Sequence, residues 1–303
     1  MSKYDLSIII LSYNTKDLLS LCLSSVDQAK MDGYNIQTIV VDNASIDKTV
    51  EMVKKKFGWV KLVESRKNLG YSAGNNLGIM KSNSQFILFL NSDVEIKKNA
   101  LVDILKFIKS DKSIGAVTPR VDLFKGGMDP DCHRGFPTPW ASATYFLGLE
   151  KLFPKSKVFA KYHLGFLNLN EAHEIDSGFG TFMIVRRKVL EKIGNWDEEY
   201  FFYGEDLDLF YRIKQAGWKV MFYPEVLALH HKGASSGLRK ESKNVTRADK
   251  KTKLKTAKSS IAAWEVFYKK FYKGKYSPLL TFIVLMAIRV KGFLRIAKFN
   301  LIK

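Results

Sequence analysis

Cysteine is nearly absent from this sequence, which contains two such residues, Cys22 and Cys132, among 303. Two cysteines so far apart build neither a disulfide framework nor a cysteine-rich metal cluster, and we expect reduced thiols in a cytosolic protein. The N-terminus lacks the basic-then-apolar pattern of a secretory leader. A nearly apolar run at residues 278–288 is shorter than the about 20 residues that a membrane-spanning helix needs.

Acidic residues are also scarce near the C-terminus. Residues 232–303 contain 19 Lys and Arg but three Asp and Glu, whereas residues 1–231 are close to neutral in a chain of net charge +19. A near-neutral domain with a basic appendage suggests two physical roles. Such an appendage suits nucleic-acid phosphates, but here the basic residues alternate with aliphatic ones and no base-reading module is evident. We therefore expect no nucleic-acid partner.

Apolar and amphipathic segments alternate through the first 110 residues, which predicts a doubly wound α/β fold with a mostly parallel sheet. The short β-branched runs are typical of strands that are buried on both faces. We expect N-caps at Thr15 and Ser45 for the first two helices. The predicted strands are 6–11, 36–41, 59–63 and 86–90, and the predicted helices include 47–56 and 100–108.

Three of these strands end in polar clusters. In parallel α/β sheets ligands bind beyond the carboxyl ends of the strands, so the three clusters should share one rim. The clusters are Ser12-Tyr13-Asn14, Asp42-Asn43 and Asn91-Ser92-Asp93.

The second half of the domain is less regular. Residues 122–174 predict a long connection with one or two short helices. Regular structure is expected again as a strand at 180–185, helices at 188–193 and 205–216, and strands at 218–223 and 226–229.

Two acidic motifs carry candidate chemistry. An Asp just past a strand end, such as Asp93, can hold a divalent cation that stabilises a departing diphosphate, although strand ends are commonly polar without any function. Asp206, in a helix start that also holds Glu205 and Asp208, can take the proton of an acceptor hydroxyl. Glu205 could share that work, and we expect Asp208 to pair with Arg212 four residues on.

His230-His231 and a glycine-containing loop complete the candidate motifs. A histidine at a strand end can be a second metal ligand, and strand alternation allows only one of these two to point inward. Residues 68–78 lack the G-x-G-x-x-G spacing of a dinucleotide fingerprint. A loop that wraps a nucleotide and then begins a helix fits better, with Asn68, Gly70 and Asn76 as contacts.

In this order and at these intervals, the motifs closely resemble glycosyltransferase family 2, particularly its rhamnosyltransferase-like bacterial members. The resemblance covers residues 5–236 and rests on Ser7–Asn14, Val41–Ser45, Asn68–Gly70, Asn91–Asp93 and Glu205–Asp208. It implies a GT-A fold, an inverting single displacement and a Mg²⁺ or Mn²⁺ ion. It also implies that Asp42 contacts the nucleotide base, that Asp93 holds the metal, that His230 rather than His231 meets the metal or the diphosphate, and that Asp206 is the base. Asn91 replaces the first acid of the metal motif, so metal affinity should be modest.

The basic tail has three parts: an aromatic stripe at 261–272, the apolar run at 278–288 and a basic amphipathic end. This pattern predicts helices lying on an anionic membrane surface. The alternative is a helical hairpin that packs on the catalytic domain or on a second copy of the chain. On the membrane interpretation, a chain ending near Ser260 should still fold.

Together these features predict a catalytic domain at 1–236, a basic linker or mobile loop at 237–258 and membrane-associating helices at 259–303. The nucleotide-sugar half of the domain is expected at 1–120 and the acceptor half at 121–236. The predicted activity is transfer from a UDP- or dTDP-sugar to a hydroxyl of a lipid-linked glycan, at the inner face of the cell membrane. Intact Asp93 and Asp206 argue against a non-catalytic nucleotide-sugar binder. The expected donor contacts are Ser12, Tyr13, Asn14, Asp42, Asn43, Asn68, Gly70, Asn76, Asn91 and Ser92.

Overall fold

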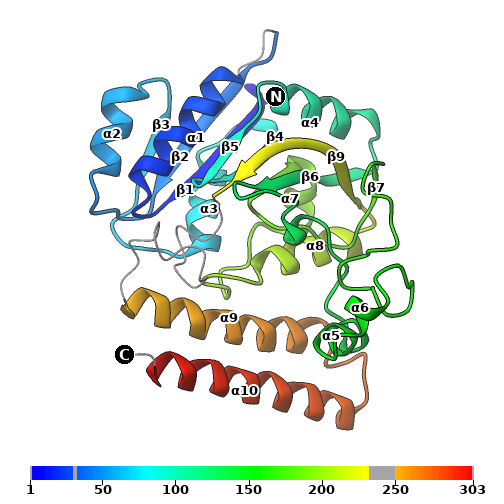
Figure 1. Cartoon of the computed structure of the whole chain (residues 1–303). Coiled ribbons are helices and arrows are strands. Elements are labelled where there is room, and N and C mark those ends of the chain that lie inside the picture. The colour runs from blue at the N-terminus through cyan, green and yellow to red at the C-terminus, as the bar shows by residue number, and fades with distance from the viewer. Residues whose placement is uncertain (1, 30–32, 232–249, 302–303) are drawn as a thin grey trace.

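The computed structural model describes residues 2–29, 33–231 and 250–301. A twisted mixed sheet forms the centre, and helices cover both of its faces (Figure 1). From one edge to the other, the strands are β3 (Lys61–Glu64), β2 (Ile36–Asp42), β1 (Tyr4–Ser12), β4 (Ser84–Asn91), β8 (Phe182–Arg186), β6 (Ile114–Leu123), β9 (Lys219–His230) and β5 (Val94–Ile96), with β7 (His173–Glu174) paired to β9.

Strands β3, β2, β1 and β4 are mutually parallel, as the sequence predicts. Beyond β4 the sheet is mixed. Strand β8 runs antiparallel to both of its neighbours, β4 and β6, whereas β6 and β9 are parallel to each other. The carboxyl ends of β1, β2 and β4 therefore meet at one rim, and their register aligns Ser12 with Asp42 and Leu11 with Asn91.

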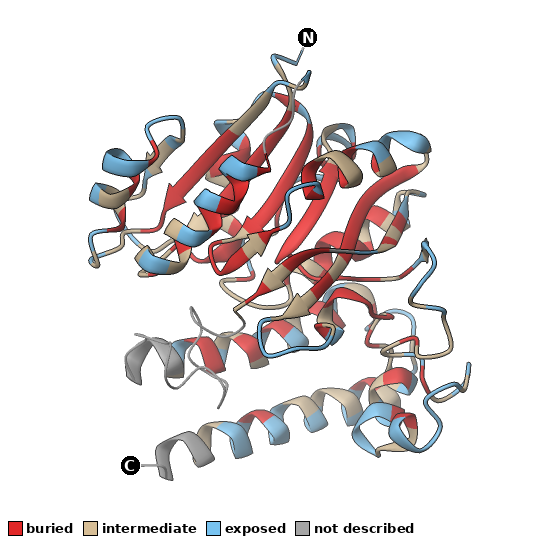
Figure 2. Ribbon diagram, turned by 45° about the horizontal axis from the view of Figure 1, so that its top comes forward, coloured by how far each residue is buried: buried red, intermediate tan, exposed pale blue. Residues whose placement is uncertain are grey.

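Two cores lie on opposite faces of the sheet, and β1 contributes to both. Ile8 and Ile10 pack in one cluster and Ile9 in the other, because successive strand side chains point to opposite faces. Figure 2 shows the buried strands between the two helical layers. The first cluster includes α1 (Lys16–Gln28), α2 (Thr49–Lys56) and α4 (Ala100–Ser110), and the second includes α3 (Tyr71–Met80), α7 (Arg187–Ile193) and α8 (Glu205–Gln215).

Neither Thr15 nor Ser45 makes the side-chain capping hydrogen bond that is expected of an N-cap. Thr15 stands before α1 but makes no side-chain capping bond, because its hydroxyl bonds instead to Ser92. The residue before α2 is Lys48, in a left-handed conformation, while Ser45 accepts a hydrogen bond from the backbone N–H of Asn14.

A central strand that the sequence analysis does not predict lies just before the irregular connection. Strand β6 occupies Ile114–Leu123, a segment in which Gly115 and Pro119 weaken the strand signal. The two strands predicted at 218–223 and 226–229 are one strand, β9, with a register shift opposite Pro119 and Arg120. The connection that follows holds η1 (Pro130–Cys132), α5 (Pro139–Phe146) and α6 (Leu149–Leu152), in agreement with the predicted short helices.

Two long helices, α9 (Lys250–Phe271) and α10 (Pro278–Leu301), lie antiparallel beneath the sheet domain (Figure 1). Part of the aromatic stripe is buried, since Phe267, Tyr268 and Tyr272 form one cluster with Leu207 and Tyr211 of α8, whereas Trp264 is exposed. The helix begins at Lys250, so residues 250–258 of the expected linker are helical, and residues 237–249 lie outside the described part. Within the described ranges no helix has the length and apolar character to cross a bilayer.

Candidate active site

The three polar strand ends meet at a cleft of about 410 Å³. The helix start that carries Glu205 and Asp206 forms the opposite side of this cleft. The polar strand ends and the acidic helix start, which the sequence singles out separately, therefore line one cleft. The α9 helix also reaches the cleft through Lys255 and Thr256, which the sequence does not indicate. Of the predicted site residues, the cleft is lined by Tyr13, Asn43, Asn68, Gly70, Asn91, Ser92, Asp93, Glu205 and Asp206.

A chain of hydroxyl groups ties the strand ends together. Ser12 Oγ lies 3.0 Å from Thr15 Oγ1, which donates to Ser92 Oγ at 2.9 Å. Asn14 has a positive φ of 54° and its side chain accepts from the N–H of Ile46. Ser12 and Asn14 thus order the rim, and neither is among the residues that line the cleft.

The Asn68–Gly70 loop is held by Asn43. The Asn43 amide donates to Asn68 Oδ1 at 3.0 Å and to the Gly70 carbonyl at 3.2 Å, and its oxygen accepts from the N–H of Leu69. Gly70 has φ +83°, and a Cβ there would lie 2.5 Å from the Phe201 carbonyl oxygen. Glycine at this position therefore lets the loop approach the chain that leads to α8.

Asp42 is buried at the end of β2 with one carboxylate oxygen unsatisfied. Its Oδ2 accepts from the N–H of Ser45 at 3.0 Å, whereas Oδ1 has no hydrogen-bond partner within the described residues. A buried acceptor without a partner is costly, so this atom is able to accept a hydrogen bond from a ligand, although Asp42 is not among the residues that line the cleft.

Asp93 and His230 face each other beside the cleft. Asp93 Oδ1 lies 3.5 Å from His230 Nε2, and the other ring nitrogen, Nδ1, lies 3.0 Å from Asp129 Oδ2. Burial lowers the pKa of His230, but Asp93 and Asp129 outweigh it and raise the pKa to about 9. The sequence leaves the two histidines undecided on the residues alone; the structure places His231 against Glu95 instead. No group of three His, Cys, Asp or Glu side chains arranged to hold an ion occurs in the described ranges.

The start of α8 presents two carboxyl groups with different surroundings. It follows Tyr203, whose positive φ of 72° strains a residue with a side chain, and Gly204, which adopts a positive φ without strain. Burial, then the nearby Asp206, raises the pKa of Glu205 well above its usual range. Burial also raises the pKa of Asp206, but Arg134 opposes this shift, with its Nη2 3.1 Å from Asp206 Oδ2. Different environments of this kind separate a neutral carboxyl from an ionised one.

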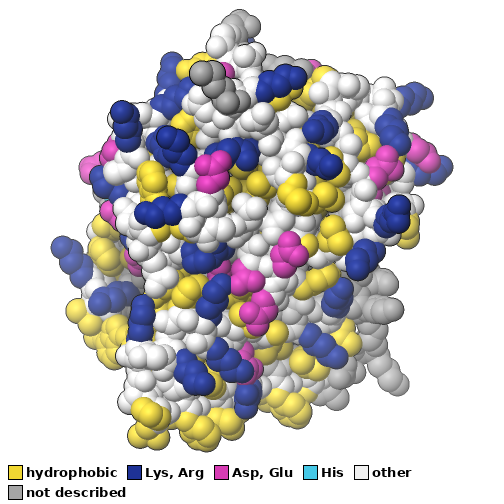
Figure 3. Space-filling model, turned by 180° about the vertical axis from the view of Figure 1, so that it is seen from behind, with side chains coloured by type: hydrophobic (Ala, Val, Ile, Leu, Met, Phe, Trp, Pro, Cys, Tyr) yellow, Lys and Arg dark blue, Asp and Glu magenta, His cyan; other side chains and the backbone are white. Residues whose placement is uncertain are grey.

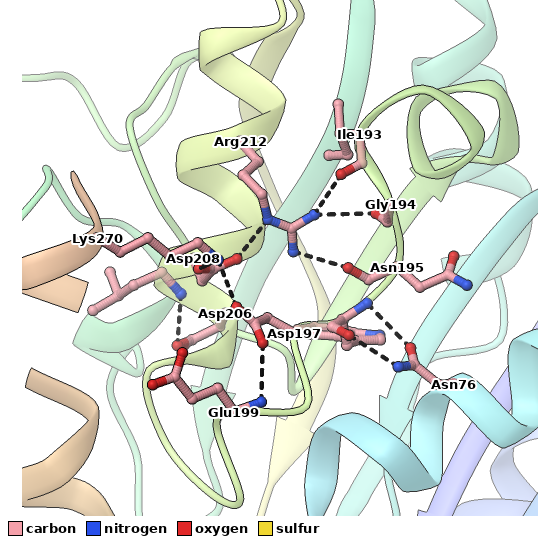
Figure 4. Close-up of polar contacts among 12 residues, drawn as sticks. Asn76, Ile193, Gly194, Asn195, Asp197, Glu199, Asp206, Asp208, Arg212 and Lys270 are labelled. Atoms are coloured by element: carbon pink, nitrogen blue, oxygen red, sulfur yellow. Dashed lines mark hydrogen bonds and ion pairs between the residues drawn. The ribbon is translucent and has the colours of Figure 1, made fainter. Parts of the chain in front are cut away.

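Two residues after Asp206, Asp208 is fully buried and holds the helix in place (Figure 4). It bonds Arg212 Nε at 2.5 Å, as the sequence predicts, and also Lys270 Nζ of α9 at 2.6 Å. Lys270 in turn reaches Asp197 Oδ2 at 2.5 Å. The Arg212 guanidinium donates to the carbonyls of Ile193, Gly194 and Asn195.

Asn76, which the sequence predicts to contact the donor, makes hydrogen bonds within the protein instead. The Asn76 amide donates to the Trp196 carbonyl and to Glu198, and its oxygen accepts from the N–H of Trp196 (Figure 4). Asn76 therefore joins α3 to the loop before α8 and is not among the residues that line the cleft.

Comparison with known proteins gives concordant results. Residues 7–194 match the model of the family described as glycosyl transferase family 2. The chain is 26% identical over 229 residues to an N-acetylglucosaminyl-diphospho-decaprenol L-rhamnosyltransferase of Mycobacterium tuberculosis, which covers 67% of this chain and 68% of that protein.

Two solved structures share the fold. GalNAc-T7 with UDP, GalNAc and Mn²⁺ has a TM-score of 0.58 at 19% identity, covering 87% of this chain but 48% of that chain. A mannosyltransferase of Pyrobaculum calidifontis with GDP-Man and Mn²⁺ has a TM-score of 0.56 at 16% identity, covering 96% and 70%. These likenesses confirm the predicted GT-A fold, and the family match over more than half of the chain shows that this protein is a glycosyltransferase of family 2.

Proposed function

We propose that this enzyme transfers a hexosyl or deoxyhexosyl group from a UDP- or dTDP-sugar to a hydroxyl of a glycan, with Asp206 as the base. The observation that carries the proposal is that one cleft is lined by both the Asn91–Asp93 strand end and Asp206. The M. tuberculosis relative is named as a rhamnosyltransferase, which supports a deoxyhexose donor. A binder without catalysis would not need a buried, Arg-paired carboxylate facing the donor side.

Asp42 is the proposed contact for the nucleotide base. Its unsatisfied Oδ1 is buried at the same rim, and an N–H of a uracil or thymine ring would satisfy it. The Asn68–Gly70 loop and Tyr13 line the adjacent part of the cleft and would enclose the rest of the nucleotide.

The residues present fit a Mg²⁺ or Mn²⁺ ion that arrives with the diphosphate and displaces the proton that Asp93 and Asp129 favour on His230. Two groups that each lie about 2.1 Å from one ion can be at most about 4.2 Å apart, and Asp93 Oδ1 and His230 Nε2 are 3.5 Å apart. Asp129 orients the ring of His230 through Nδ1, as acids beside metal-binding histidines do. The bound ion would stabilise negative charge on the departing diphosphate. Asn91 would add at most a neutral oxygen.

Asp206 would accept the proton of the acceptor hydroxyl as its oxygen attacks the anomeric carbon and the bond from that carbon to the diphosphate oxygen breaks. Attack from the side opposite the leaving group inverts the anomeric centre in one displacement. A single ionised carboxylate is enough for this chemistry, and Glu205, which burial favours in its neutral form, would not compete for the proton.

The test of this assignment is Asp206→Asn. We expect transfer to fall by at least about 10²-fold, the low end for general-base catalysis, while calorimetric binding of the nucleotide sugar stays within twofold. Asp17→Asn, an exposed carboxylate on α1, is the matched control and should leave both unchanged. Normal turnover by Asp206→Asn would remove it as the base. A panel of UDP- and dTDP-sugars would identify the donor.

A lipid-linked acceptor and a peripheral place on the inner face of the cell membrane belong to the same proposal. The outward face of α10 carries a continuous apolar stripe, and residues 278–301 contain no acid. Figure 3 shows hydrophobic side chains along the lower edge of the molecule, where Figure 1 places α10, with Lys and Arg close by. The exposed side chains of the stripe are Leu279, Phe282, Ile283, Met286, Val290, Phe293 and Leu294.

The α5–α6 segment extends this stripe. Lys291 of α10 lies 3.5 Å from the ring centroid of Phe146, and Leu147 and Leu152 are exposed nearby in the chain. A second copy of the chain would bring like charges together, whereas an anionic leaflet complements them. Because α9 lines the cleft through Lys255 and Thr256, a bilayer under α10 would lie one helix away from the cleft.

A vesicle flotation assay tests the membrane part separately. The full chain should float with vesicles that contain anionic phospholipid and should be released as salt rises, because screening weakens the charge term. Binding to neutral vesicles should be weaker. A concentration-dependent dimer without flotation would instead assign the α10 face to a second copy.

A further inference from the structure

Arg134 is a buried cation next to the proposed base, and neither the sequence motifs nor the family resemblance assigns it a role. Resting on the proposed function of Asp206, we propose that Arg134 is a positioning residue that keeps Asp206 in its carboxylate form and aims it into the cleft.

The position of Arg134 is set by contacts that do not involve Asp206. Its backbone N–H donates to the Ser177 carbonyl at 2.9 Å, and its own carbonyl accepts from the N–H of Ser177 at the same distance. Its Nη2 donates to the Gly178 carbonyl at 2.5 Å. The residue is 8% exposed. The guanidinium is therefore a fixed charge to which the Asp206 side chain is matched.

Asp206 needs such a charge because burial and Asp131 disfavour its ionisation, although the backbone N–H of Leu207 favours it. Burial is the largest cause of its raised pKa, and Asp131 raises that pKa further, while Arg134 lowers it. An arginine cannot give up its proton in this range, so its effect persists at every working pH. The titratable or charged groups that face Asp206 or share its cleft are Glu205, Arg134, Asp131, Tyr162, Tyr71, Lys255, Asp93, Tyr13 and Tyr203.

The hydrogen bonds also decide how the carboxylate is oriented. Asp206 Oδ1 accepts from the N–H of Leu207 at 2.8 Å, and Oδ2 is bonded by Arg134. Each oxygen keeps a second lone pair, and Asp206 lines the cleft. Arg134 thus fixes the side chain while leaving an acceptor site for a substrate hydroxyl.

Asp131 provides a variant with the opposite effect. Its Oδ1 lies 3.6 Å from Arg134 Nη1, so it attracts the same guanidinium as Asp206 and adds a nearby negative charge. Replacement of Asp131 by Asn removes its negative charge, so the Arg134 guanidinium then interacts with Asp206 without competition from Asp131. Replacement of Arg134 by Gln removes that charge, whereas Lys retains a cation without the second donor.

The experiment is the pH dependence of kcat, with saturating donor and acceptor, for the full-length wild type and these three variants. In Arg134→Gln the acid limb should move to higher pH by at least about one unit, since an opposite charge at this distance lowers a carboxyl pKa by about 1–3 units. Arg134→Lys should shift it less, and Asp131→Asn should shift it to lower pH. A purely structural Arg134 would lower kcat at every pH without moving the limb.

The failure of this inference can be separated from failure of the proposed function. An inactive Asp206→Asn together with unmoved limbs in all three variants would overturn the role of Arg134 and leave Asp206 as the base. An active Asp206→Asn would overturn the base itself. If Arg134→Gln does not fold, the opposite shifts of Arg134→Lys and Asp131→Asn decide the question.

Discussion

The two C-terminal helices share a basic, amphipathic pattern but lie in different environments. Both are basic, and both carry apolar residues at helical spacing. In α9 that face packs on α8, where Phe267 is 2% exposed. In α10 much of it faces outward, and Phe282 is 63% exposed. Because both helices are basic and both have apolar residues at helical spacing, these two features cannot tell which helix belongs to the catalytic body.

Polar anchors make the difference. Lys270 of α9 lies between Asp197 and the buried Asp208, whereas the described ion pair of α10, Arg289 with Glu265, connects it to α9. The apolar face of α9 therefore packs on the catalytic domain, as the hairpin alternative expects, and we take α9 as part of the catalytic body. A chain ending near Ser260 would lose Phe267 and Lys270, so we no longer expect it to fold normally.

The largest expected effect comes from truncation. A chain ending at residue 249 should lose roughly 5 kcal/mol or more of unfolding free energy, because each of the buried aromatics of α9 contributes about 1.5–3 kcal/mol. A chain ending at Ser277 keeps α9 and should remain folded and active on a water-soluble acceptor. Urea denaturation followed by tryptophan fluorescence measures both. Equal midpoints for the two truncations would show that α9 is as peripheral as α10.

A single substitution in α9 should have the next largest effect. Lys270→Met leaves buried Asp208 with Arg212 alone, and we expect a loss of about 1–2 kcal/mol, discounted because Lys270 is partly exposed. Lys269→Met removes a neighbouring surface pair with Glu265 and should cost no more than about 0.5 kcal/mol. If both variants unfold at the same urea concentration, the Lys270 anchor does not distinguish the helices.

Substitutions in the α10 stripe should separate binding from stability. Phe282→Ser with Phe293→Ser should greatly reduce flotation with anionic vesicles while changing the unfolding free energy by less than about 0.5 kcal/mol, as exposed sites do. Leu147→Ser in the adjoining segment should have a smaller effect of the same kind. A large loss of stability would mean that the stripe is covered by protein in solution.

The smallest effect on stability is expected from the ion pair that joins the two helices, between Arg289 of α10 and Glu265 of α9. The hydrogen bonds from Arg289, then Lys269, lower the pKa of Glu265 to about 2. A lowered pKa means that the contribution is present above the ordinary pKa near 4.5 and is lost as pH falls toward 2. The small deficit of Arg289→Ala in urea midpoint should accordingly be visible at pH 7 and shrink below pH 4.5. A deficit that is independent of pH would point to lost packing instead.

The sequence predicts what depends on neighbours along the chain. Each parallel strand ends in polar residues, and because parallel strands share a direction, Tyr13, Asn43 and Asp93 arrive at one cleft. The pairing of Asp208 with Arg212 follows from helical spacing alone. Strand β6 was missed because Gly115 and Pro119 interrupt its pattern, although it lies inside the sheet.

Contacts between distant segments were not predictable in this way. Arg134 and Asp129 lie in the irregular connection, where nothing in their local sequence indicates that they meet Asp206 and His230. Lys270 is one of many lysines in a basic tail, and only its packing against α8 distinguishes it. Each buried carboxylate of the acidic motifs requires a partner, and the local sequence does not show which distant residue supplies it.

The close contact at Gly70 has a kinetic consequence. The N–H of Tyr71 donates to the Phe201 carbonyl at 2.8 Å, so the loop expected to enclose the nucleotide is fastened to the chain that leads into α8. Movement of that loop on loading would displace the segment carrying Asp206. We therefore expect an ordered mechanism, in which the donor binds first and the acceptor second, and product-inhibition patterns should show the nucleoside diphosphate competing with the donor alone.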